Sequence, residues 1–219
     1  MQNSLQFFTT KVYGLMTGAL LVSGLTAYFV SQTPALTSFV NQTGVFIVLL
    51  ILQLVLVFVV SGLWQKLSSA VATFLMFAYA ILNGVLLNYI FLAYDLGSVL
   101  TIFLASAAFF LILALIGATT KLDLTKLGNI ALIGLIVTIV VSLVNLFLRN
   151  DLLSLILDAV VVLFFVGITM YDAQRIRQVS ELGNRAEINR LAVPLALSIY
   201  LDFINIFIRL LSLFGRSRD

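Results

Sequence analysis

The chain has 219 residues, of which 62% are hydrophobic and 10% are charged, and its formal net charge is +3. Soluble domains carry about 25% charged residues, so this composition excludes a water-soluble globular protein. The lack of Cys and His excludes thiol nucleophiles and imidazole metal sites. The basic residues are scattered instead of forming a stripe, which argues against a nucleic-acid partner.

Seven apolar runs, separated by short polar breaks, follow one another along the chain. A helix needs about 20 apolar residues to cross a hydrocarbon layer about 30 Å thick. The first run contains Gly14-x-x-x-Gly18 and Ser23-Gly24, small residues at a spacing that favours close helix packing in lipid. The sequence therefore predicts an all-α protein with one integral membrane domain over 1–219, embedded in the lipid bilayer. Its spans are expected at 12–30, 44–63, 70–93, 98–118, 129–148, 152–178 and 191–214.

Lys and Arg divide unevenly between the two sides of this predicted bundle. Because cytoplasmic loops are enriched in these residues, we expect a multi-pass protein of the cell (plasma) membrane with its N-terminus in the cytoplasm and its C-terminus outside. The predicted cytoplasmic side holds eight of them: Lys11, Lys66, Lys121, Lys126, Arg175, Arg177, Arg185 and Arg190. The opposite side holds three: Arg149, Arg216 and Arg218.

Two aspartates interrupt the sixth predicted span. A charged side chain near the bilayer centre costs about 2.5–3.5 kcal/mol on insertion scales, so such residues are mostly paired or functional. Helical periodicity continues past Asp172 to a predicted C-cap at Gly183-Asn184, which indicates that Asp172 lies inside the helix. Asp172 could instead pair with Arg175 in the membrane interface. Asp158 could lie in an outer vestibule or in the interface.

The seventh predicted span carries a polar stripe. Ser198, Asp202, Asn205 and Arg209 share one face of a helix, so this face must contact protein or water and the helix is expected at the centre of the bundle. Pro194 is expected in its first turn. Asp202 and Arg209 lie two turns apart, about 10 Å, which is too far for a direct ion pair. Three asparagines elsewhere are expected to form interhelical hydrogen bonds: Asn83, Asn88 and Asn145.

The two central aspartates are expected to meet. If the turn before the last helix centres near residue 187, Asp172 lies fifteen residues before it and Asp202 fifteen residues after it. Two carboxyl groups in contact at low dielectric share a proton, because ionising both is costly. The pair could then act as a proton-dependent latch that opens by repulsion or takes up a cation. With Asn205 and water it offers too few oxygens for tight Ca²⁺ binding, so a weak, transient calcium site is expected, as permeation requires.

Two segments resemble the transmembrane Bax inhibitor family, including its bacterial calcium-leak members. They are Met170–Ile176, with the sequence MYDAQRI, and Ala196–Phe207, with the sequence ALSIYLDFINIF. The resemblance implies a bundle in which three helical hairpins surround the C-terminal helix. It also implies that Asp172 and Asp202 form a pH-sensitive pair that gates passive Ca²⁺ flux. A basic residue after the second helix, here Lys66, would help to hold the closed state.

Three functions are compatible with these features. The first is a proton-gated calcium leak, with Ca²⁺ and protons as its ligands, no cofactor and no enzymatic activity; Lys66, Asp158, Asn205 and Arg209 are then latch or pore-lining candidates. The second is a non-conducting regulator that binds another membrane protein. The third is an intramembrane aspartyl protease, because two aspartates sharing a proton also suit that chemistry. Against the protease, Tyr200-Leu201 stands before Asp202 where a Gly-x-Gly motif is expected.

Overall fold

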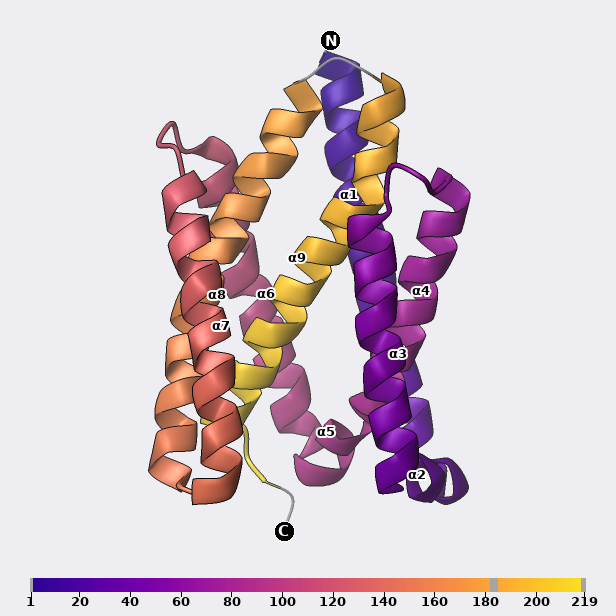
Figure 1. Cartoon of the computed structure of the whole chain (residues 1–219), viewed down its shortest axis with the longest axis vertical. Helices are drawn as coiled ribbons and strands as arrows, with labels where there is room; N and C mark the ends of the chain where they lie inside the picture. The colour runs from indigo at the N-terminus through magenta and orange to yellow at the C-terminus, as the bar shows by residue number, and fades with distance from the viewer. Residues whose placement is uncertain (1, 182–184, 218–219) are drawn as a thin grey trace. The chain divides into compact units, whose positions relative to one another are not determined.

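The computed structural model describes residues 2–181 and 185–217, and residues 2–6 and 185–187 by their backbone alone. Figure 1 shows a helical chain. Its helices are α1 (Gln2–Ser31), α2 (Pro34–Val40), α3 (Thr43–Gly62), α4 (Ser69–Leu86), α5 (Asn88–Ala93), α6 (Leu96–Thr119), α7 (Thr125–Leu148), α8 (Asp151–Glu181) and α9 (Arg185–Phe214). Within the described residues, seven helices are long and apolar enough to cross a membrane, with α4 and α5 together forming the third. The predicted fold class is confirmed.

The helices extend beyond several predicted spans: α1 begins at Gln2 and α7 at Thr125, where spans were expected from 12 and 129. Two further differences change the assignment of a segment. The short helix α2, which begins at Pro34, lies in the segment expected to be a loop; proline suits the first position of a helix because its ring fixes φ. Helix α9 begins at Arg185 and contains Pro194 in its interior, so the expectation that Pro194 lies in a first turn is wrong. The predicted cap at Gly183-Asn184 lies outside the described residues.

The chain forms two compact units, and α9 contributes to both. The first unit contains α1 to α5 and α9 as far as Tyr200, and the second contains Gly97–Gln178 and Leu201–Arg216. Among the described candidate spans, α9 is the most buried: 67% of its apolar stretch is buried, against 6% of that of α3. Each unit therefore has part of α9 in its core. The prediction of one membrane domain stays a prediction.

In the first unit, α1 packs on α4 and α5, and α3 packs on α4. Gly84 of α4 allows the closest approach, because a methyl group there would overlap the backbone of Ser23. Of the small residues predicted to pack, Gly18 faces Phe77 at 3.3 Å from its ideal Cβ position, whereas an added Cβ at Gly14 or Gly24 meets nothing within 4 Å. The motif prediction is therefore right for Gly18 and wrong for the other two glycines.

A buried hydrogen-bond network joins four helices of the first unit. The Tyr200 hydroxyl lies 2.6 Å from Ser23 Oγ and accepts from Asn83 Nδ2 at 2.6 Å. Gln53 Nε2 donates to Asn83 Oδ1 at 2.8 Å and to the Tyr79 hydroxyl at 2.9 Å. Asn83 thus forms the interhelical contacts that were predicted for it. Such bonds contribute about 0.6 kcal/mol each on average in a membrane protein.

In the second unit, glycines bring α8 close to α6 and α7. A methyl group at Gly117 would overlap the Met170 backbone, and one at Gly128 would overlap the ring of Tyr171. On α9, Phe203 stacks edge to face against Phe103 and Phe110 of α6, with ring centroids 5.3 Å and 5.8 Å away. These contacts fix the part of α8 and the part of α9 that carry the candidate site.

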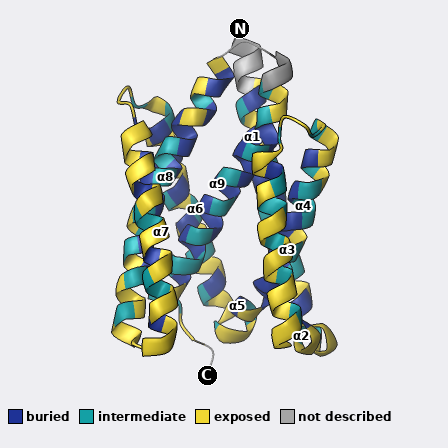
Figure 2. Cartoon of the chain, viewed as in Figure 1, coloured by how far each residue is buried: buried dark blue, intermediate teal, exposed yellow. Residues whose placement is uncertain are grey.

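The outward faces of the helices are apolar. Figure 2 shows long exposed stretches on α3 and α7, and these include Phe58, which is 73% exposed, and Phe147, which is 89% exposed. Contiguous apolar surface on this scale is unusual for a soluble protein. It matches the lipid-facing surface expected of a membrane protein.

Candidate functional site

Asp172 of α8 and Asp202 of α9 are buried in the second unit. Their residues are 4% and 3% exposed, and the two carboxyl groups interact electrostatically with each other. Asp172 lies nine residues before the end of α8 at Glu181, well inside the helix. Arg175 is exposed, which argues against an interfacial pair between it and the buried Asp172. The structure thus brings together the two acidic residues that the sequence singled out.

Thr169 is a third polar residue at this position, and the sequence analysis missed it. It lies one turn before Asp172 on α8, it is 1% exposed, and its hydroxyl is beside the Asp202 carboxyl group. Thr169 Oγ1 and Asp202 Oδ2 are both buried without a hydrogen-bond partner. Because they lie side by side, the Thr169 hydroxyl can donate to this carboxyl group, and the two groups together could hold a water or a cation.

Three other helical threonines use their hydroxyl differently. Thr17, Thr101 and Thr138 each donate to the backbone carbonyl four residues earlier, at 2.8–2.9 Å. This is the usual bond for a threonine inside a helix. The Thr169 hydroxyl departs from it and is available to Asp202. The i, i+3 spacing of Thr169 and Asp172 is the sequence signal that could have identified it.

The counting argument that paired the aspartates rested on a wrong turn position. Residue 187 lies within α9, which begins at Arg185. Counted from the helix ends, Asp172 is nine residues before Glu181, whereas Asp202 is seventeen residues after Arg185. A straight antiparallel hairpin would place them at different depths. Their interaction therefore does not follow from residue counting along a straight hairpin.

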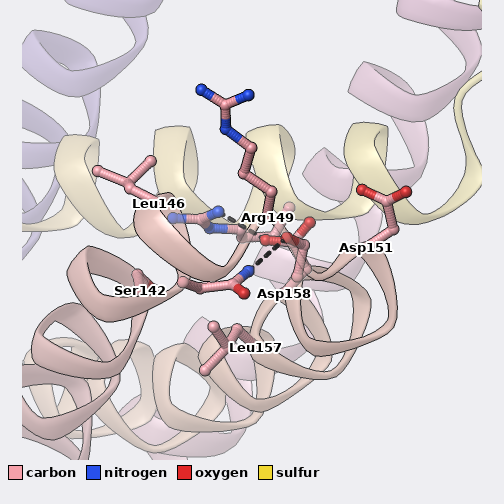
Figure 3. A pocket seen from close by; sticks show the side chains of 9 residues that line it. Ser142, Leu146, Arg149, Asp151, Leu157 and Asp158 are labelled. Carbon is pink, nitrogen blue, oxygen red and sulfur yellow. Dashed lines mark hydrogen bonds and ion pairs between the residues drawn. The ribbon is translucent and has the colours of Figure 1, made fainter.

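Asp158 and Arg209 form an ion pair in the second unit. Arg209 Nη1 donates to Asp158 Oδ1 at 2.6 Å, and Ser212 Oγ donates to Asp158 Oδ2 at 2.5 Å. Asp158 is 7% exposed, so its charge is buried and compensated. The pair stands at the edge of a pocket of about 310 Å³ (Figure 3).

The remaining candidates belong to the first unit or form hydrogen bonds elsewhere. Asn205 Nδ2 donates to the Leu201 carbonyl of its own helix at 2.8 Å. Lys66 is exposed in the turn between α3 and α4 of the first unit. Asn145 bonds Ser154 across the α7–α8 connection, as predicted, but Asn88 donates to the nearby Val85 carbonyl. The interhelical prediction is therefore wrong for the Asn88 amide donor.

Comparison with known proteins agrees with this architecture. Residues 5–219 match the family described as "Inhibitor of apoptosis-promoting Bax1". The chain is 36% identical to the inner membrane protein YbhL of Escherichia coli, over 98% of this chain and 93% of that protein. It is 39% identical to an uncharacterized protein of Borreliella burgdorferi, over 97% of this chain and 93% of the relative. An uncharacterized membrane protein of Streptococcus pyogenes is 37% identical over the same shares.

Proposed function

Since this chain belongs to the transmembrane Bax inhibitor family, we propose that it is a pH-sensitive passive calcium leak channel gated by Asp172 and Asp202. The observation that carries the proposal is the burial of two interacting carboxyl groups within a membrane-spanning bundle. Ionisable residues buried in membrane spans are rare and commonly mark ion and proton pathways.

The gate works through one proton. With a proton shared between them, the carboxyl groups hydrogen-bond and hold α8 to α9. When the proton leaves, two negative charges face each other at low dielectric, where repulsion is strong. The helices then separate, or a cation enters between the carboxylates. Ca²⁺ flux is therefore expected to rise with pH.

Weak binding of the ion is part of this proposal. Asp172 and Asp202 supply up to four carboxylate oxygens and Thr169 adds a hydroxyl, whereas Ca²⁺ takes six to eight oxygen ligands. Water must supply the remainder, so the ion is held loosely and can leave. Asn205, whose amide bonds its own helix, Lys66, Asp158 and Arg209 remain proposed latch or pore-lining residues.

The proposed orientation places the N-terminus in the cytoplasm and the C-terminus outside, because eight Lys and Arg residues lie on the N-terminal side and three on the other. The chain has no Cys, so single cysteines introduced at Lys66 and Arg149 report the orientation directly. Labelling by an impermeant reagent from outside intact cells at Arg149→Cys alone supports it, and labelling at Lys66→Cys alone contradicts it.

The test of the function is Ca²⁺ flux into vesicles that contain the purified chain and a trapped calcium dye. Flux should increase from acidic to alkaline pH, and Asp172→Asn and Asp202→Asn should each remove this pH dependence. Asp123→Asn, an exposed carboxylate outside the spans, is the matched control and should behave like the native chain. Flux equal to that of protein-free vesicles at every pH would end the proposal. In that case a partner recovered in equal amounts with the chain would support the non-conducting regulator.

A further inference from the structure

The pocket at the α7–α8 end of the second unit is lined by neither Asp172 nor Asp202. Its volume of about 310 Å³ lies in the range of small-ligand pockets. Figure 3 shows the Arg149 and Asp151 side chains extending to the same side of it. The lining residues are Ser142, Asn145, Leu146, Arg149, Asp151 and Ser154 from the connection between the two helices, with Leu157, Asp158 and Arg209.

Most polar groups of the pocket already have partners within the protein. Ser142 Oγ donates to the Thr138 carbonyl at 2.8 Å, and Asn145 Nδ2 donates to Ser154 Oγ at 2.8 Å. Both oxygens of Asp158 accept hydrogen bonds, from Arg209 and Ser212. These groups build the walls of the pocket and leave little to offer a ligand.

Arg209 is different, because part of its guanidinium is unused. Its Nη1 bonds Asp158, but its Nε is buried without a partner. The side chain as a whole is 38% exposed and lines the pocket. The N–H groups on its exposed part can donate to an oxygen of a phosphate or carboxylate group.

Arg149 adds a second positive charge from an unusual backbone position. Its φ of 50° places it in the left-handed region at the end of α7, where glycine or asparagine is the common residue. Helix capping therefore gives no reason for arginine here. Its side chain lines the same pocket as Arg209, so the two guanidinium groups can approach one anion.

The charged side chains that remain in the pocket favour a ligand that carries both a negative and a positive group. Arg209 balances Asp158, which leaves the exposed side chains of Arg149 and Asp151. An anionic group suits the arginines, and a cationic group that donates hydrogen bonds suits the Asp151 carboxylate. A phosphate joined to a primary ammonium by a short linker has both features.

The surroundings favour a lipid as the source of this group. The pocket lies where α7 ends and α8 begins, the depth at which headgroups meet a spanning helix. Phe147 and Leu152, adjacent in sequence to the lining residues Leu146 and Asp151, are 89% and 66% exposed, so acyl chains can cover them. We propose that this pocket binds the headgroup of phosphatidylethanolamine, with the phosphate at Arg149 and Arg209 and the ammonium at Asp151.

The test is lipid binding to the purified full chain in detergent, measured by native mass spectrometry and by the thermal unfolding midpoint. Phosphatidylethanolamine should bind more tightly than phosphatidylcholine, whose methylated ammonium cannot donate to Asp151, and more tightly than phosphatidylglycerol, which has no cation. Arg149→Gln should weaken phosphatidylethanolamine and phosphatidylcholine alike, by about tenfold for a charge-assisted hydrogen bond. Asp151→Asn should remove the preference for phosphatidylethanolamine, a change of about two- to fivefold.

Two control variants separate loss of the lipid site from other effects of substitution. Arg149→Gly removes the guanidinium but supplies the residue that the left-handed backbone favours, so weakened lipid binding by this folded variant cannot be ascribed to a damaged turn. Lys121→Gln removes an exposed positive charge from the connection between α6 and α7 and should bind lipid like the native chain. Equal binding of all three lipids, or native binding by Arg149→Gly, would overturn the proposal. So would soluble phosphoethanolamine that binds as tightly as the lipid, because the source would then be a free metabolite.

Discussion

Arg209 Nη1 lies 2.6 Å from Asp158 Oδ1 and so links the last helix to the start of α8. The Asp158 side chain is 10% exposed and that of Arg209 is 38% exposed. Removing one partner of a buried pair leaves a charge without compensation, which costs more than the pair itself contributes.

We therefore expect Arg209→Gln to lower the free energy of unfolding by about 1–3 kcal/mol, the lower end applying because Arg209 is partly exposed. The double variant Asp158→Asn with Arg209→Gln should recover part of this loss, since no buried charge then stands alone. Thermal unfolding in detergent measures both. A double variant less stable than Arg209→Gln would show that the pair does not account for the effect.

Thr169→Val tests the third residue of the aspartate site. Valine keeps the shape of threonine but removes the hydroxyl beside Asp202, so Ca²⁺ flux should fall by about fivefold, as expected for loss of one neutral oxygen ligand of about 1 kcal/mol. Thr169→Ser should retain most of the flux. Thr138→Val is the control, because that buried hydroxyl bonds only the Gly134 carbonyl of its own helix. Equal flux through Thr169→Val and the native chain would remove Thr169 from the site.

Gly117 tests the packing of α6 against α8. Any side chain there would overlap the backbone of Met170, so Gly117→Ala should destabilise the chain by about 1–3 kcal/mol through overpacking. Gly62→Ala in α3 is the comparison, because an added Cβ there meets nothing within 4 Å. It should be neutral or stabilising, since alanine favours helix. The difference between the two unfolding midpoints in detergent is the measurement, and similar midpoints would contradict the overlap.

Asp123, which lies outside the candidate spans, should make the stability of the chain depend on pH. Hydrogen bonds from the Thr125 side chain, and then from its backbone N–H, lower the pKa of Asp123 below its ordinary value of 3.8. Because the folded pKa is the lower one, the stabilisation is complete above the ordinary pKa and is lost as the pH falls through the folded pKa. Asp123→Asn should therefore be slightly less stable than the native chain at neutral pH. The two midpoints should converge in strong acid, and a gap that widens there would contradict the assignment.

The sequence predicted the spans well because an apolar run of sufficient length has few other outcomes in lipid. It misplaced the start of α9, because an interior proline ordinarily costs a helix about 3 kcal/mol. Burial outweighs that cost here: Ala192 and Val193, which precede Pro194, are both 0% exposed. Tertiary packing, which is not visible in local propensity, extends the helix through the proline.

Side-chain pairing was predicted less completely than the spans, for geometric reasons. Asp158 lies 23 residues before the end of α8 and Arg209 lies 24 residues after the start of α9, so correct helix boundaries would have paired them by counting. The same counting fails for Asp172 and Asp202, because residue counts do not contain the packing of the helices. Thr169 was missed because a sequence does not indicate which way a hydroxyl turns.

The network of Ser23, Tyr200, Asn83 and Gln53 has a consequence for how protons move. The side-chain amides of Asn83 and Gln53 stand between the hydroxyl groups of Tyr200 and Tyr79. A carboxamide donates and accepts hydrogen bonds without passing its own protons along, so these two amides interrupt proton transfer between the two tyrosines. These residues hold α1, α3, α4 and α9 together by hydrogen bonds and do not form a continuous proton pathway. Breaking this network should therefore loosen the packing of the four helices that it joins.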